Sequence, residues 1–68
     1  MKLFDVVALL EDMPASNLSK GQVGTIVEEL DNENVFVEFS DVNGRTYAQE
    51  PLHVSKLMEL RHAPVLAA

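Results

Sequence analysis

The sequence contains no cysteine and no tryptophan, and only 6% of its residues are aromatic. Without cysteine the chain can form no disulfide framework, present no thiolate and offer zinc no sulfur ligand, and such a composition fits a reducing cytoplasm. Basic residues are also few, with five Lys and Arg against eleven Asp and Glu and a formal net charge of -6. This charge argues against nucleic acid and anionic membranes as partners and favours a basic protein surface.

Long hydrophobic runs are missing as well. No segment approaches the roughly 18 apolar residues of a membrane span, and the apolar stretch 3–10 is interrupted by Asp5. We therefore expect no signal segment and a cytoplasmic location. With 68 residues, 47% hydrophobic and 24% charged, the chain has the composition of one small globular domain. We assign residues 1–61 to this domain and 62–68 to a short C-terminal tail.

Short apolar, β-branched segments separated by turn signals predict an all-β fold. The clearest is 35–39, where Val35, Val37 and Phe39 alternate with Phe36 and Glu38, the period of a half-buried strand. The other expected strands, with a bulge near Gly24 in the second, are 6–10, 25–30, 46–49 and 57–61.

The segments between these strands read as turns. A long loop fills 11–20, the polar run 31–34 predicts a tight turn, and the pair Asn43-Gly44 predicts a hairpin. Pro51 argues against a continuous strand through 50–57, and that segment is too short for a stable helix of its own. We predict one 3-10 turn there, with Leu52 as its apolar anchor.

About five antiparallel strands with one 3-10 turn before the last strand describe a small SH3-like barrel. Closing the sheet buries both edges and one face around a single centre. The rival arrangement is an open meander completed by a partner. The expected core residues are Val6 or Val7, Ile26, Val37, Phe39, Tyr47, Leu52 and Leu57.

Two segments, 20–28 and 35–39, resemble a bacterial family catalogued as domain of unknown function 4926. In the first, Gly21 and Gly24 precede the run Thr25-Ile26-Val27, and the likeness extends through most of the chain to about Leu60. The resemblance implies an SH3-like barrel and a small cytoplasmic bacterial protein without known catalysis. It also implies an antitoxin- or immunity-type role toward a small toxin-like protein.

The same glycine-containing block is more loosely similar to two other groups. One is the KOW segment of transcription and ribosomal factors, which would imply a nucleic-acid or ribosome-associated module. The other is the barrel of the nitrile hydratase small subunit and activator group, which would imply an accessory subunit of an enzyme complex. Much of this shared pattern is what the geometry of such a barrel requires.

Residues with catalytic or ligand chemistry are not arranged in a recognisable motif. The Gly21 to Gly24 segment is followed by a strand and has only Lys20 beside it, whereas a phosphate loop needs a helix N-terminus or more cations. His53 and His62 are nine positions apart without a further zinc-type ligand. We predict a non-enzymatic protein with no catalytic residues, no cofactor and no metal.

The best candidate function is protein binding. Phe36 lies opposite the predicted core face of its strand, so it can serve as an aromatic anchor. Acidic residues near it would form a rim that attracts a basic partner, and the loop 11–18 would add contacts. The predicted rim consists of Glu28, Glu29, Asp31, Glu33 and Glu38. The sequence leaves the partner's identity and the oligomeric state open.

Overall fold

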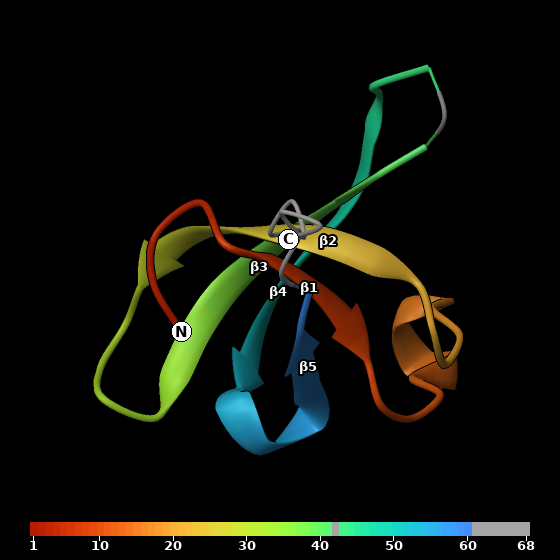
Figure 1. Cartoon of the computed structure of the whole chain (residues 1–68). Coiled ribbons are helices and arrows are strands. Elements are labelled where there is room, and N and C mark those ends of the chain that lie inside the picture. Colours follow the sequence, from red (N-terminus) through yellow and green to blue (C-terminus); the bar gives the residue numbers. More distant parts are fainter. Residues whose placement is uncertain (42, 61–68) are drawn as a thin grey trace, which may run out of the picture.

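The computed structural model describes residues 1–41 and 43–60 of the 68-residue chain, apart from the side chain of Tyr47. Its strands form one antiparallel sheet in the order β4-β3-β2-β1-β5, curled into a half-barrel (Figure 1). The elements are β1 Val6–Leu9, η1 Pro14–Ser16, β2 Val23–Glu29, β3 Asn34–Ser40, β4 Thr46–His53, η2 Val54–Lys56 and β5 Leu57–Glu59, where η marks a 3-10 turn. This confirms the predicted small all-β barrel fold with a 3-10 turn before its last strand.

The core lies against the concave face of the sheet. Alternation along β3 buries Val35, Val37 and Phe39 completely, as predicted, and leaves Phe36 and Glu38 half-buried on the other face. Ile26, Leu52 and Leu57 are also buried, and β1 contributes Val7 rather than Val6. The core also contains Leu9 and Leu18, which were not predicted, and Val35, which was placed on the inner face of its strand but not named among the expected core residues. The expected core position of Tyr47 concerns a side chain outside the described part of the structure.

The irregularity in β2 lies further along the strand than we predicted. The pairing register between β2 and β3 shifts between Ile26 and Glu28. Gly24 itself pairs regularly with Phe39. Gly24 is needed for space instead: a Cβ there would lie 2.7 Å from Val37 Cγ1 and 2.9 Å from the backbone oxygen of Glu38. The missing side chain lets the Val37 and Phe39 side chains of β3 pack against the β2 backbone.

The prediction for segment 50–57 was wrong in its first half. β4 continues through Pro51 and Leu52 to His53, and the 3-10 turn covers only Val54–Lys56. Among the described strands β4 pairs with β3 alone, and an edge strand tolerates proline because one row of its N–H groups needs no partner in the sheet. Leu52 is buried as a strand residue, not as the anchor of a helical turn.

The two hairpin turns form where they were predicted. Leu30 N donates to Asn34 O at 3.0 Å across the first, and Asp41 N donates to Arg45 O at 2.9 Å across the second. β5 is shorter than the predicted 57–61 and ends at Glu59. The predicted domain end at 61 and the tail 62–68 lie outside the described residues.

Candidate protein-binding surface

Phe36 lies on the outer face of β3, opposite the core side chains. Its neighbours across the sheet are Glu28 on β2 and Pro51 on β4, and all three share this face. The ring is half-buried, whereas Glu28 and Pro51 are exposed. The bulge produces this arrangement: without the extra residue in β2, Val27 would stand opposite Phe36 in place of Glu28.

Glu38 shares the outer face and is held by the neighbouring strand. Thr46 Oγ1 donates to Glu38 Oε1 at 2.6 Å, and Gln49 Nε2 donates to Glu38 Oε2 at 3.3 Å. Both carboxylate oxygens therefore have a donor from β4. Glu38 is therefore a positioned acceptor on the face of Phe36, and each carboxylate oxygen can accept a further hydrogen bond.

Asp31 has a structural role in the turn between β2 and β3. Its Oδ1 accepts hydrogen bonds from the backbone N–H groups of Glu33 and Asn34, both at 2.8 Å, and from Asn34 Nδ2 at 3.0 Å. These donors, the Glu33 N–H first among them, lower the pKa of the Asp31 carboxyl. Asp31 thus fixes the hairpin that carries Phe36.

Glu33 ties the same turn to the end of β4. Its Oε2 lies 3.5 Å from His53 Nε2. His53 Nδ1 accepts from Ser55 N at 3.0 Å, so the proton of the neutral ring is on Nε2 and faces Glu33. This places His53 in a contact that supports the fold.

The six predicted binding residues therefore do not form one surface. Phe36, Glu28 and Glu38 come together on the outer face. Asp31 and Glu33 are engaged in the turn, and Glu29 is exposed at the end of β2 opposite Val35, on the other side of the sheet from Glu28. Adjacent residues of a strand point to opposite faces of the sheet, so the two glutamates cannot share one surface.

The loop predicted to add contacts, 11–18, is folded back on the domain. Met13 and Leu18 form an isolated bridge, and Leu18 is buried in the core. Glu11 forms an ion pair with Lys56, and Asp12 Oδ1 accepts from Lys20 N at 2.8 Å. A shallow hollow lies beside η1, lined by Asp12, Pro14, Asn17, Leu18 and Ser19.

Sequence reasoning missed Phe4, the most exposed large apolar side chain in the described structure. It is 71% exposed and has a positive φ of 70°, a conformation that a bulky residue rarely adopts. Phe4 N donates to Ile26 O at 2.7 Å, and Lys2 N donates to Asp5 Oδ2 at 2.8 Å. No sequence pattern signals this turn, which is held by contacts with β2.

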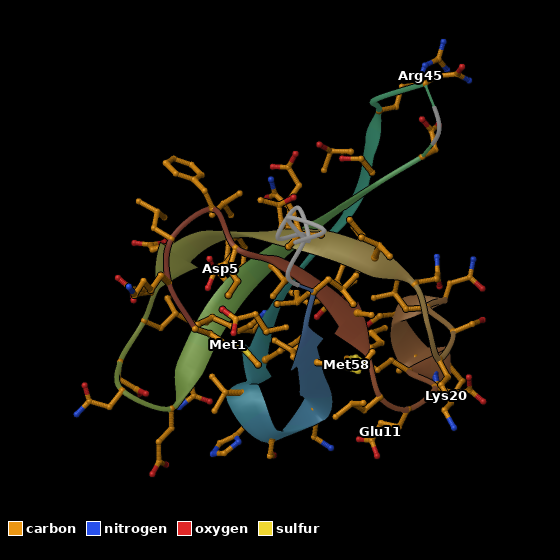
Figure 2. All side chains as sticks on the ribbon, viewed as in Figure 1. Met1, Asp5, Glu11, Lys20, Arg45 and Met58 are labelled. Carbon is orange, nitrogen blue, oxygen red and sulfur yellow. The ribbon has the colours of Figure 1, made fainter. Side chains whose placement is uncertain are left out.

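The few cations of the described residues are dispersed. Figure 2 shows Lys20 near the first loop and Arg45 at the tip of the projecting β3–β4 hairpin, at opposite ends of the molecule. No group of three or more His, Asp or Glu side chains in the described part of the chain could hold a metal ion. The helical segments described are single 3-10 turns, and none has the length and apolar character to cross a membrane.

These features define a small, curled all-β domain whose outer face combines a half-buried aromatic side chain with two carboxylates, one of them oriented by hydrogen bonds from β4. A family model described as domain of unknown function (DUF4926) matches residues 3–59, and the chain belongs to this family. Comparison with curated proteins and with solved structures found no match. The looser likenesses to KOW segments and to the nitrile hydratase group stay predictions.

Proposed function

We propose that this protein is a non-enzymatic binding module that takes a basic protein partner on the outer face around Phe36. The observation that carries the proposal is the juxtaposition of a half-buried aromatic side chain with two carboxylates, Glu28 and Glu38, on one face of the sheet. Aromatic side chains dominate the energetics of protein interfaces, and flanking charges guide the approach of an oppositely charged partner.

The neighbours of Phe36 suit it to such a role. Pro51 beside it adds apolar surface without side-chain mobility, and the β4 donors fix Glu38 before a partner arrives. A preorganised surface loses less conformational entropy on binding than a mobile one. The net charge of -6 extends the attraction beyond the face itself.

A narrower form of the proposal is an antitoxin- or immunity-type module that binds a small toxin-like protein in the cytoplasm. Its support is the family resemblance, together with a cysteine-free composition that suits a reducing compartment.

The proposal is tested by capturing partners from the native cell with three forms of the chain: the natural sequence, Phe36→Ser and Leu3→Ser. Leu3 is an exposed apolar residue before β1 and serves as the matched control. A partner bound through the Phe36 face is retained by the natural chain and by Leu3→Ser, is lost with Phe36→Ser, and is released by salt. Equal recovery with all three forms, or recovery that salt does not reduce, contradicts the proposal.

A further inference from the structure

The tip of the β3–β4 hairpin carries the one Asn-Gly pair of the sequence, Asn43-Gly44. The hairpin extends away from the rest of the sheet (Figure 1), and Figure 2 shows Arg45 at its tip. Asn43, Gly44 and Arg45 are all exposed. Gly44 has a positive φ of 79°, and a Cβ built on it would meet no described atom within 4 Å. Water and hydroxide therefore reach the peptide bond between Asn43 and Gly44.

An asparagine followed by glycine is chemically labile in water. The backbone nitrogen of Gly44 loses its proton to hydroxide and attacks Cγ of Asn43; the bond from Gly44 N to Cγ forms, the bond from Cγ to Nδ2 breaks, and ammonia leaves. Water then opens the cyclic imide at one of its two carbonyl carbons and gives aspartate or isoaspartate. In sum, one water is consumed and one ammonia is released. A side chain on the residue after asparagine hinders the attack, and glycine has none.

The other three asparagines, Asn17, Asn32 and Asn34, are less suited to this reaction. Each of them precedes a residue with a side chain. Asn34 Nδ2 donates to both carboxylate oxygens of Asp31 at 3.0 Å, so the amide that would have to leave is held. Leu18, which follows Asn17, is buried in the core, so the N–H that would attack is shielded from hydroxide.

Asp41 holds the turn in which this reaction takes place. Its Oδ1 accepts from the backbone N–H groups of Asn43 at 2.8 Å and Arg45 at 3.0 Å. Its backbone oxygen accepts from Gly44 N at 3.0 Å, so the attacking nitrogen is engaged while the turn is closed. None of the described residues of this turn belongs to the core. The tip can therefore open, and release the Gly44 nitrogen, without unfolding of the sheet.

We propose that Asn43 is a site of spontaneous deamidation in the folded protein and that the Asp41 turn sets its rate. Either product adds a carboxylate to a chain whose net charge is already -6. Isoaspartate also lengthens the main chain by one carbon, so the three hydrogen bonds to Asp41 no longer fit together. Thr46 follows this turn and donates to Glu38 Oε1 at 2.6 Å, so the modification loosens a donor that positions Glu38. Deamidation at this turn is independent of what the outer face binds.

The experiment is incubation of the full chain at neutral and at mildly alkaline pH, with peptide mapping by mass spectrometry and methylation by an isoaspartate methyltransferase at intervals. We expect loss of the Asn43 amide, with both aspartate and isoaspartate at this position, at a rate that rises with the hydroxide concentration. The other three asparagines should keep their amides. Asn43→Gln should abolish the modification, because glutamine has to close a larger ring, which forms much more slowly.

Two variants that remove equivalent turn bonds separate local opening from a general loss of stability. Asp41→Ala should accelerate the loss of the Asn43 amide several-fold, because both Oδ1 bonds are removed. Asp31→Ala removes the equivalent bonds in the β2–β3 turn and should leave the rate at Asn43 unchanged. Asp41→Ser, whose hydroxyl bonds more weakly in turns, replaces Asp41→Ala if the latter does not fold.

Retention of the Asn43 amide in the folded chain over the time in which the urea-unfolded chain loses it overturns the inference. So does faster loss at another asparagine. An equal effect of the Asp31 and Asp41 variants on the rate at Asn43, whether acceleration or none, would show that the Asp41 turn does not set this rate and would also overturn it.

Discussion

At the scale of single residues, two phenylalanines three positions apart on β3 have opposite roles. Phe39 is fully buried in the centre of the core, and Gly24 is kept free of a side chain that would collide with it. Phe36, on the opposite side of the same alternation, is half-buried between Glu28 and Pro51. Phe39 therefore stabilises the fold, whereas the exposed part of Phe36 is available for binding.

Truncation of the buried ring tests this assignment of the core. Phe39→Ala should lower the free energy of unfolding by about 3 to 5 kcal/mol, through lost apolar burial and the cavity left behind. Small domains have total stabilities of about 5 kcal/mol upward, so much of the chain should be unfolded near room temperature. Urea denaturation of both forms measures the difference, and a midpoint close to that of the natural chain would refute the assignment.

The positive φ of Phe4 predicts an unusual order of stability between its glycine and alanine variants. Alanine ordinarily stabilises a folded chain more than glycine does, by about 0.5 to 1 kcal/mol. At Phe4, where φ is 70°, a side chain is itself unfavourable, so Phe4→Gly should be the more stable of the two variants by about 1 kcal/mol. Thermal melts of both variants compare them. A higher melting temperature for Phe4→Ala would mean that the turn does not hold its positive φ in solution.

At the scale of elements, the sequence predicts a strand well when the evidence is local. The alternation in β3 is sufficient to assign its core face, and the polar run Asp31 to Asn34 is sufficient to place a turn. The extent of β4 was not predictable in this way. Whether a strand tolerates Pro51 depends on whether it lies at an edge, which is decided by the rest of the sheet.

The candidate site also combines features that the local sequence predicts with features that depend on the rest of the sheet. The opposite orientations of Glu28 and Glu29 follow from strand geometry, but the placement of Glu28 against Phe36 depends on a bulge at Val27 that no local signal marks. Asp31 was assigned to the binding rim because of its charge. Its side chain instead accepts backbone hydrogen bonds in the turn, a use of Asp that turn chemistry favours.

The hydrogen bonds of Asp31 in the turn between β2 and β3 predict how the stability of the fold depends on pH. Hydrogen bonds from Glu33 and Asn34 lower the folded-state pKa of Asp31, so its contribution to stability is present above the unfolded value of about 3.9 and is lost as pH falls through the folded value. Asp31→Asn keeps an acceptor oxygen but does not titrate. The variant should therefore lose less stability than the natural chain when pH is lowered from about 5 to about 2.

Comparison of the two forms is needed because Asp5 also has a lowered pKa, caused first by the Glu59 side chain and then by the Lys2 backbone. This contribution is common to both forms and cancels in the difference. Denaturation curves at a series of acidic pH values provide the measurement. Parallel losses of stability in the two forms would show that Asp31 does not bond to the turn in solution.

At the scale of the whole molecule, charge and fold divide the outer face into two halves. The β3 half has an aromatic ring and carboxylates. On the other half, the exposed apolar side chains in the described part of the chain are Val6, Leu10, Val23, Met58 and Leu60. A small half-barrel buries one face of its sheet and must expose the other. The proposed binding function rests on the composition of that exposed face.

The same charge distribution predicts that RNA and DNA do not bind at physiological salt. Binding to phosphate backbones depends on counterion release by clustered cations. Here Lys56 is paired with Glu11, and Lys20 and Arg45 lie at opposite ends of the molecule (Figure 2). Fluorescence anisotropy with labelled single- and double-stranded oligonucleotides tests this. A salt-dependent affinity in the micromolar range would favour the KOW-like function over protein binding.

The central claim, that Phe36 anchors a protein partner, is tested most directly by a melting curve and a binding titration with the captured partner on one sample of Phe36→Ser. Because more than half of Phe36 is covered, the substitution should cost about 2 kcal/mol of stability and lower the melting temperature by about 8–16 °C. Affinity should fall by about 2 kcal/mol, roughly 30-fold. Unchanged affinity in a folded variant would contradict the claim, and loss of the fold itself would show that Phe36 belongs to the core.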